Sequence, residues 1–281
     1  MVVKDKERKE ERLSIVKIGG NIVDDPELLE SFLCDFHRLE GRKLLVHGGG
    51  VMASKMAVEL GIETKMIQGR RITDADTLKL VTMVYAGWIN KNMVASLQKI
   101  GCNAIGLSGV DGNTIPALRR SPVPVDYGFV GDPDPEKVNA HFISQLIEAG
   151  ITPVFCAITH DGNGSLLNTN ADTIAYSVAT ALSEIYETSL YYCFEKEGVL
   201  MDMTDPDSLI RTMNREECEV YRQQGVIADG MIPKLDNSFR AIEKGVKEVI
   251  ILHAKNLLLK KGTVLVENQP GSKQKQHPGT L

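Results

Sequence analysis

Residues 13–50 read LSIVKIGGNIVDDPELLESFLCDFHRLEGRKLLVHGGG and contain two short apolar segments separated by a helical stretch. The segments LSIVKI (13–18) and KLLVH (43–47) are bounded by glycine or charged residues, as is typical of buried strands. Residues 26–38 between them predict a helix. Because two parallel strands need a long crossover, usually a helix, this pattern favours a parallel β–α–β unit.

The rest of the chain repeats the alternation of strands and helices. Further buried strands are predicted at CNAIGL (102–107), ITPVFCAI (151–158), SLYYCF (189–194), EVIIL (248–252) and TVLVE (263–267). Helices are predicted at 52–60, 74–99, 136–149, 171–186, 214–223 and 234–245. Residues 110–135 break the rhythm with five of the eleven prolines, so we expect a hairpin or lid near a ligand there. The fold class is therefore α/β, with a mostly parallel sheet and helices on both faces.

The composition is that of an ordinary globular protein, with 43% hydrophobic and 25% charged residues. A net charge of −5 argues against nucleic acid as a partner, since its polyanionic backbone favours a basic surface. No apolar run reaches the roughly 20 residues needed to cross a bilayer, and residues 1–12 lack the apolar core of a signal peptide. We therefore expect a cytoplasmic protein with no membrane partner. The five cysteines are far apart in the sequence: Cys34, Cys102, Cys156, Cys193 and Cys218. We expect them to be reduced thiols that do not form a structural zinc site.

Glycine-rich turns end the first two predicted strands, as KIGGN (17–21) and HGGG (47–50). In open α/β sheets, ligands bind outside the carboxyl ends of the strands. Glycines let backbone N–H groups approach an anion, a helix N-terminus adds partial positive charge, and Lys17 supplies a mobile cation. The glycines could instead only form tight turns, but two such turns with an embedded lysine favour a phosphate site. Neither turn has the P-loop or the dinucleotide-binding fingerprint.

Two later segments also open predicted helices, LLNTNAD (166–172) and DGMIPK (229–234). Asp172 suits a helix start because the helix dipole favours a carboxylate there, which needs no catalytic role. Lys234 stands in the first turn of its predicted helix, where a cation opposes the dipole. A bound anion would explain that unfavourable position.

Eight segments occur in the order KIGGN (17–21), HGGG (47–50), GRRITD (69–74), INKNMV (89–94), GLSGVDGN (106–113), YGFVGD (127–132), LLNTNAD (166–172) and DGMIPKL (229–235). With them the chain resembles the amino acid kinase family, in its acylglutamate kinase branch. The resemblance covers residues 13–267 and implies a three-layer αβα sandwich with a largely parallel central sheet. It implies an acylglutamate-binding lobe at 13–187 and an ATP-binding lobe at 188–267, flanked by a charged lead at 1–12 and a flexible tail at 268–281.

The resemblance implies a role for each matching residue. Lys17 and Lys234 would contact the phosphoryl group and the nucleotide, and Asp172 would orient both lysines. Arg71 and Asn168 would bind the acylglutamate. The backbone donors to phosphate would be Gly19, Gly20, Gly48 and Gly49, with Gly49 also contacting the substrate. The Mg²⁺ cofactor would be carried by ATP, with no metal ligand from the protein.

The implied activity is ATP-dependent phosphorylation of the side-chain carboxylate of N-acetyl-L-glutamate, the second step of arginine biosynthesis. The residues agree, because a carboxylate attacking a phosphate needs cations along its path but no general base. His47 is accordingly expected to shape its turn rather than to act in catalysis. Alternatives are another branch of the family, a non-catalytic sensor on the same fold, and a dinucleotide-dependent oxidoreductase, which the missing fingerprint disfavours.

Two positions depart from the family pattern. Arg70 replaces an apolar residue, and its extra cation leaves N-succinylglutamate open as an alternative substrate. Glu195 replaces an aspartate on the nucleotide side, so no role is assigned to it. Arginine-inhibited relatives are hexamers with an interlacing N-terminal helix and an acidic C-terminal segment. Here residues 1–12 have no apolar stripe and residues 256–263 carry two lysines, which predicts a homodimer that arginine does not inhibit.

Overall fold

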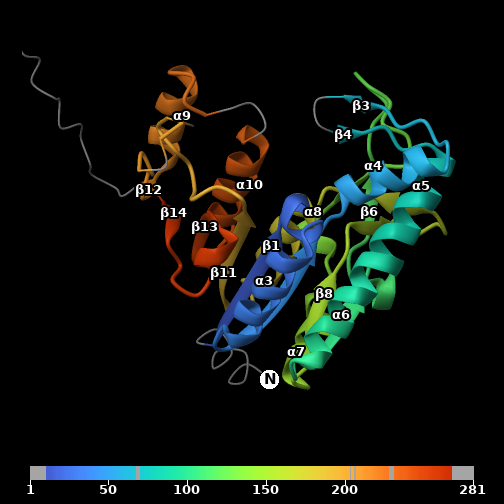
Figure 1. Cartoon of the computed structure of the whole chain (residues 1–281), viewed down its shortest axis with the longest axis horizontal. Helices are drawn as coiled ribbons and strands as arrows, with labels where there is room; N and C mark the ends of the chain where they lie inside the picture. Colours follow the sequence, from blue (N-terminus) through green and yellow to red (C-terminus); the bar gives the residue numbers. More distant parts are fainter. Residues whose placement is uncertain (1–10, 68–69, 203, 206, 228–230, 268–281) are drawn as a thin grey trace, which may run out of the picture.

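A mixed β-sheet runs through the centre of the protein and is covered by helices (Figure 1). The computed structural model describes residues 11–67, 70–202, 204–205, 207–227 and 231–267. Within them the sheet has eight strands in the order β12-β14-β13-β11-β1-β2-β8-β5. The strands are β1 (Arg12–Ile18), β2 (Arg42–His47), β5 (Ala104–Leu107), β8 (Thr152–Phe155), β11 (Glu187–Phe194), β12 (Thr212–Met213), β13 (Glu248–His253) and β14 (Gly262–Leu265).

The six strands from β13 to β5 in this order run parallel, so their carboxyl ends meet along one edge of the sheet. The apolar residues of β1 are buried on both faces, which explains why this strand is an almost continuous apolar run. β14 is antiparallel to β13 because the connection 254–261 is too short for a helical crossover. The prediction of an α/β fold with a mostly parallel sheet is confirmed.

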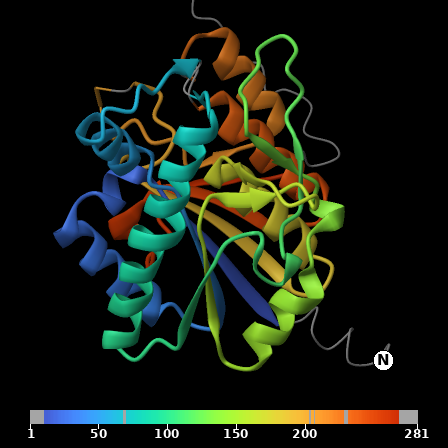
Figure 2. The ribbon, with the colours of Figure 1, turned by 90° about the vertical axis from the view of Figure 1, so that its right-hand side faces the viewer.

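Helices cover both faces of the sheet, which makes a three-layer αβα sandwich (Figure 2). α3 and α6 lie on one face, whereas α7, α8 and α10 lie on the other. α8 packs directly against β1, β2 and β11. The α-helices of the described residues are α2 (Gly20–Val23), α3 (Pro26–Arg38), α4 (Gly50–Glu59), α5 (Ala75–Thr82), α6 (Asn90–Lys99), α7 (Ala140–Glu148), α8 (Ala171–Leu182), α9 (Arg215–Gln223) and α10 (Ile232–Glu243).

Three predicted elements differ in detail. The run 151–158 is not one strand: after β8 the chain leaves the sheet, and β9 (Ile158–His160) pairs antiparallel with β10 (Leu166–Asn168). Residues 75–99 are helical as expected, but their middle is a π-helix, η1 (Met83–Ile89), which the apolar pattern does not reveal. The predicted helix 136–149 is broken before α7, because Asn139 caps α7 by accepting a hydrogen bond from the backbone N–H of Phe142.

The proline-rich region 110–135 contains a hairpin, as expected. Its strands are β6 (Ala117–Arg119) and β7 (Gly131–Pro133), which pair antiparallel. A second small hairpin is formed by β3 (Met66–Ile67) and β4 (Arg70–Arg71). Four of the five cysteines are buried and all five are unpaired, as their apolar surroundings predict. Within the described residues, every helix is too short or too polar to span a lipid bilayer.

Two expectations concern the ends of the chain. β1 begins at Arg12, so the predicted lead 1–12 overlaps the first strand by one residue. The remainder of that lead up to residue 10, and the predicted tail 268–281, lie outside the described residues.

Candidate active site

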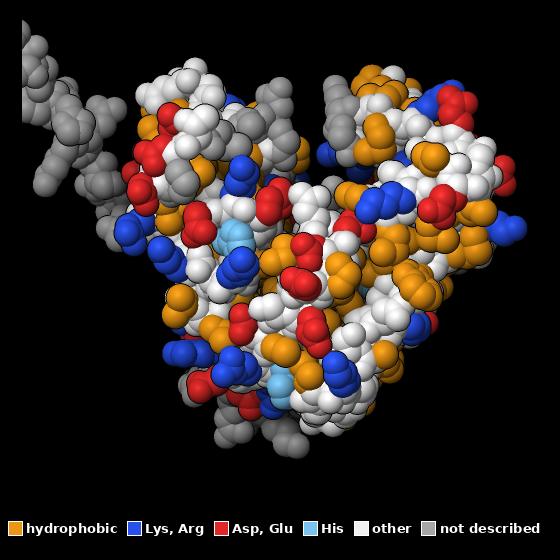
Figure 3. All heavy atoms as spheres, viewed as in Figure 1, with side chains coloured by type: hydrophobic (Ala, Val, Ile, Leu, Met, Phe, Trp, Pro, Cys, Tyr) orange, Lys and Arg blue, Asp and Glu red, His pale blue; other side chains and the backbone are white. Residues whose placement is uncertain are grey.

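A cleft of about 590 Å³ opens at the carboxyl ends of the parallel strands, and Figure 3 shows the molecule hollowed on this side. All nine predicted site residues line it. They come from segments far apart in the sequence: Lys17, Gly19, Gly20, Gly48, Gly49, Arg71, Asn168, Asp172 and Lys234. The sheet topology explains this convergence, because the loops after β1, β2 and β11 and the starts of α8 and α10 all face the same edge.

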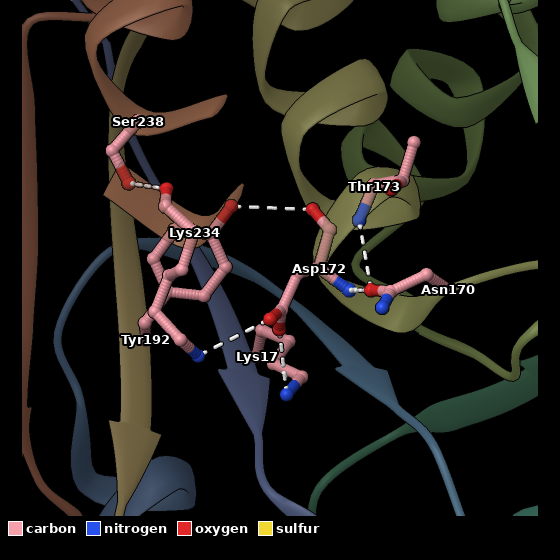
Figure 4. Close-up of polar contacts among 7 residues, drawn as sticks. All are labelled: Lys17, Asn170, Asp172, Thr173, Tyr192, Lys234 and Ser238. Carbon is pink, nitrogen blue, oxygen red and sulfur yellow. Dashed lines mark hydrogen bonds and ion pairs between the residues drawn. The ribbon is translucent and has the colours of Figure 1, made fainter. Parts of the chain in front are cut away.

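Two lysines share one carboxylate in the cleft (Figure 4). Nζ of Lys17 lies 2.6 Å from Oδ1 of Asp172, and Nζ of Lys234 lies 3.2 Å from Oδ2. The side chains of Lys17 and Lys234 are only 12% and 13% exposed, so both cations are largely withdrawn from water. Each ammonium therefore has a fixed position and still faces the cleft.

Local structure holds Asp172 in place. Asn170 caps α8, and its Oδ1 accepts hydrogen bonds from the backbone N–H of Asp172 at 2.7 Å and of Thr173 at 3.4 Å. This cap fixes the first turn of α8, where the helix dipole favours the carboxylate. The short polar segment NTNAD therefore sets both the start of the helix and the position of its carboxylate.

Electrostatics keep the Asp172 carboxylate ionised. Burial opposes the ionisation of Asp172, but the ammonium groups of Lys17 and Lys234 outweigh it and hold the pKa of Asp172 well below its ordinary value. Burial lowers the pKa of Lys234 from its ordinary value, and Asp172 counteracts part of that shift. Asp172 and Glu195 are the acidic residues that line the cleft, and Lys17, Lys234, Arg70, Arg71 and Arg120 are the basic ones, so the site is net positive and suited to an anion.

The turn after β2 is shaped by its glycines. Gly49 has φ of 156°, and a Cβ there would lie 2.3 Å from Cδ1 of Ile89 and 2.9 Å from Cδ1 of Tyr85, so only glycine fits. A Cβ on Gly48 would meet nothing closer than Ala171 at 3.7 Å. α4 begins directly after this turn without any side-chain cap. Its first N–H groups are therefore suited to an anion in the cleft.

Buried hydrogen bonds of His47 and Asn90 hold the same turn in place. His47 is fully buried; its Nδ1 donates to the carbonyl of Gly48 at 2.7 Å, and its Nε2 accepts from Nδ2 of Asn90 at 3.0 Å. Asn90 also donates to the carbonyl of Val154 at 3.0 Å. Burial lowers the pKa of His47 to about 4, so the imidazole is neutral near pH 7. His47 thus braces the glycine turn, in agreement with the expectation from the sequence.

Arg71 is buried beside the start of α4, and part of its guanidinium group is unpaired. Its Nη2 donates to the carbonyl of Gly50 at 2.9 Å and to Oγ of Ser54 at 2.7 Å. Its Nη1 is buried and has no hydrogen-bond partner among the described residues. An unpaired, desolvated guanidinium nitrogen costs free energy unless a ligand meets it. Arg71 is therefore arranged to receive an anionic group such as a carboxylate.

Asn168 lines the cleft and is linked to the backbone of Arg71. Its Nδ2 donates to Oγ1 of Thr73 at 3.0 Å, and Thr73 in turn donates to the carbonyl of Arg71 at 3.2 Å. These two hydrogen bonds fix the side chain of Asn168 relative to β4, the strand that contains Arg71. Asn168 therefore lines the cleft in a fixed orientation.

Several lining residues were not singled out from the sequence. Ser54 in α4 and Tyr85 in η1 also line the cleft. Neither belongs to a sequence motif, so the sequence pattern did not identify them. Arg120 lines the cleft from the hairpin and is paired with Asp132 at 2.9 Å through Nε. Arg70 and Glu195, which depart from the family pattern, line it as well.

Comparison with known proteins gives a consistent result. A model of the amino acid kinase family matches residues 12–253. A protein of Phocaeicola vulgatus named acetylglutamate kinase is 55% identical over 255 residues, which span 91% of this chain and 98% of the relative. The structure of smu.665 from Streptococcus mutans superposes with a TM-score of 0.75 at 26% identity, covering 93% of this chain and 98% of that one. N-acetylglutamate synthase from Neisseria gonorrhoeae shares the fold, with a TM-score of 0.77 at 20% identity, over 99% of this chain and 64% of that chain.

Proposed function

Because the chain belongs to the amino acid kinase family, we propose that it transfers the γ-phosphoryl group of ATP to the side-chain carboxylate of N-acetyl-L-glutamate. The observation that carries this proposal is the pair of ammonium groups, Lys17 and Lys234, on opposite oxygens of Asp172. The pair lines the same cleft as two glycine turns that suit phosphates and an arginine that suits a carboxylate. A non-catalytic sensor would not need this triad.

The reaction joins two anions, and the residues of the cleft meet that difficulty directly. An oxygen of the substrate carboxylate attacks the γ-phosphorus, a new P–O bond forms, and the bond to the bridging oxygen of ADP breaks. Charge accumulates on the transferring phosphoryl group and on the leaving oxygen. Lys17 stabilises the phosphoryl oxygens, Lys234 stabilises the nucleotide side, and Asp172 holds both cations at their positions. No proton has to be removed, since the carboxylate is ionised at neutral pH.

The other end of the cleft holds the amino acid. Nη1 of Arg71 pairs with the substrate α-carboxylate, and Asn168 hydrogen-bonds the amide of the acyl amino acid. Backbone N–H groups at Gly19, Gly20, Gly48 and Gly49 contact phosphate oxygens, and Gly49 also lies at the substrate. In this arrangement residues 13–187 bind the acylglutamate and residues 188–267 bind ATP.

Mg²⁺ enters with the nucleotide. Both oxygens of Asp172 already contact lysines, and no group of three or more His, Cys, Asp or Glu suited to a metal occurs in the described part of the chain. The phosphate oxygens of ATP would hold the ion, which adds positive charge to the transferring group. The cleft residues fit such a complex because they supply cations and N–H donors to its phosphates, while both oxygens of Asp172 are occupied by lysines.

The working form is a cytoplasmic homodimer. Hydrophobic side chains gather on the flank over α5 and α6 (Figure 3), and the π-helix η1 between these two helices has Met83 49% and Trp88 63% exposed. A patch of this kind on a helix face is typical of a contact between proteins. A second copy of the chain is the partner that needs no further component.

A coupled assay of ADP release tests the activity. N-acetyl-L-glutamate, N-succinyl-L-glutamate and free glutamate are compared under saturating MgATP. We expect turnover with the acetyl compound and none above background with free glutamate. ATP consumption without acyl phosphate formation, or turnover with free glutamate alone, would contradict the proposal.

Arg70 supports a second substrate, because its cation lines the cleft beside Arg71. N-succinyl-L-glutamate has an additional carboxylate that this cation would meet. If succinyl is accepted, Arg70→Leu should lower kcat/KM for the succinyl compound more than for the acetyl compound. An equal effect on both substrates would remove this alternative.

A further inference from the structure

Two aromatic side chains of β11 contact the ammonium group of Lys234. Tyr192 is fully buried, and its ring centroid lies 4.8 Å from Nζ of Lys234. Phe194 stands two residues further along the strand, on the same face, with its ring centroid 5.7 Å from the same nitrogen. Lys234 therefore lies against two aromatic rings on one side and against Asp172 on another.

Tyr192 also contacts the helix that carries the carboxylate. Its hydroxyl donates to the backbone carbonyl of Asp172 at 3.2 Å (Figure 4). Burial raises the pKa of Tyr192 well above its ordinary value, so the hydroxyl stays a neutral donor. In the sheet, Tyr192 is the register partner of Lys17 in β1. One side chain thus touches Lys234 and the first turn of α8, beside the strand that carries Lys17.

The aromatic contact solves a problem of charge. An ammonium group withdrawn from water needs stabilisation, and a second carboxylate would provide it at the cost of cancelling the positive charge that a phosphate requires. An aromatic face attracts a cation through its quadrupole, without a formal negative charge. The donors of Lys234 that do not point at Asp172 therefore remain available to a phosphate.

We propose that Tyr192 is a positioning residue for phosphoryl transfer, whose ring holds the Lys234 ammonium beside Asp172 and whose hydroxyl fixes the start of α8. Its catalytic consequence rests on the function proposed above. The contact between the ring and the ammonium does not, and it can be measured separately.

Three variants separate the ring, the hydroxyl and simple loss of core packing. Tyr192→Leu removes the ring, and we expect kcat to fall about tenfold, the size of one desolvated cation–π contact. Tyr192→Phe keeps the ring, and kcat should stay within about threefold of the unmodified enzyme. KM for the acylglutamate should change little in both, because Tyr192 is absent from the substrate end of the cleft.

Tyr191→Leu is the matched control. Tyr191 is the neighbour of Tyr192 in β11, is equally buried, and projects from the opposite face of the strand. Its ring lies 5.5 Å from Nζ of Lys260, outside the cleft. This variant should lose stability to a degree comparable with Tyr192→Leu while its kcat remains near that of the unmodified enzyme.

The pKa of Lys234 distinguishes the proposed role of Tyr192 from a contribution to core packing alone, because loss of packing alone would leave this pKa unchanged. The charged groups facing Lys234 are Asp172 from α8, Lys17 from β1 and Glu195 after β11, and all three remain in the variants. Removing the ring disfavours the charged form, so the pKa of Lys234 should fall in Tyr192→Leu and the alkaline limb of kcat should move to lower pH. Competitive acetylation with acetic anhydride, read by mass spectrometry across pH, gives this pKa without any turnover.

The outcomes distinguish the two proposals. An unchanged Lys234 pKa in Tyr192→Leu, or a kcat no lower than that of Tyr191→Leu, overturns the role of Tyr192. A lowered pKa in an enzyme that does not phosphorylate acylglutamate overturns the proposed function and leaves the ring contact intact. If Tyr192→Leu does not fold, trifluorophenylalanine at this position keeps the shape and weakens the ring quadrupole. A kcat equal to that of Tyr192→Phe would then refute the proposal.

Discussion

The ammonium nitrogen of Lys17 lies 2.6 Å from Oδ1 of Asp172, which joins the end of the first strand to the first turn of α8. Both side chains are largely buried, and both stand on rigid elements: Lys17 on a central parallel strand and Asp172 on a capped helix. The backbone therefore determines their separation, and the ammonium does not have to be ordered when a phosphate arrives. This preorganisation is what an electrostatic catalyst requires.

Replacement of either lysine should affect turnover more than binding. For Lys17→Ala and Lys234→Ala we expect kcat to fall by about 10²–10³, the usual effect of removing one electrostatic donor to a transition state. KM values should change far less. Lys99→Ala is the control, because Lys99 is a mostly exposed lysine paired with Glu30 on the surface. Steady-state kinetics with near-normal kcat in either cleft variant would remove that lysine from the mechanism.

Loss of the carboxylate should change how stability depends on pH. The folded-state pKa of Asp172 lies below its ordinary value, so its ionised form stabilises the protein above about pH 4, and this stabilisation is lost as the pH falls towards the folded-state pKa. Asp172→Asn should lower the free energy of unfolding near neutral pH, on the order of 3 kcal/mol, because two buried cations lose their partner. Urea denaturation at about pH 6 and about pH 3 should show the difference between the proteins shrinking in acid. A difference independent of pH would contradict this ion-pair assignment.

Arg71→Lys should weaken binding of the acyl amino acid selectively. Lysine keeps the charge but cannot contact Gly50, Ser54 and a substrate carboxylate through one planar fork. We expect KM for the acylglutamate to rise by about tenfold or more, with KM for ATP nearly unchanged. Arg119→Lys, on the exposed side of the hairpin, serves as the control. An effect confined to ATP would move Arg71 to the nucleotide side.

The two middle glycines of the second turn should respond differently to alanine. Gly49→Ala would place a methyl group 2.3 Å from Ile89 at a backbone conformation that disfavours side chains, so we expect a loss of stability of about 1–3 kcal/mol. Gly48→Ala meets only ordinary contacts within the protein. It should fold with nearly unchanged stability and raise KM for ATP, since its methyl group would obstruct the approach of a phosphate. An unchanged KM for ATP in Gly48→Ala would argue against a phosphate at Gly48.

Millimolar arginine should not inhibit the enzyme. Lys260 and Lys261 make residues 256–263 positively charged, and they would repel the guanidinium of an effector. Assays with and without arginine, together with light scattering, test this expectation and the predicted homodimer. Strong inhibition or a hexameric mass would refute it.

The variant Trp88→Asp tests the position of the dimer interface. It should yield monomers if the exposed flank over α5 and α6 is the interface.

The fold was predictable from sequence because its central strands are buried on both faces. Such strands are continuous apolar runs, and the helices between them have their own periodicity and caps. The run 151–158 shows the limit of this reasoning. Cys156 and Ala157 are apolar like the strand before them, and no local property marks the point where the chain leaves the sheet to pair with β10. Strand partners are chosen by the whole sheet, so a single segment cannot reveal them.

The candidate site followed from sequence to the extent that its residues stand at strand ends and helix starts. Lys17, Asp172 and Lys234 each occupy such a position, and a single parallel sheet necessarily brings those positions to one edge. Residue type, position along an element and the edge of the sheet were thus determined by the sequence itself. The sequence alone did not determine which atoms are in contact, because contacts at about 3 to 5 Å depend on strand register and helix packing. Tyr191 and Tyr192 are identical neighbours in the sequence, and only the pleat of β11 against α8 puts one of them under Lys234 and the other near Lys260.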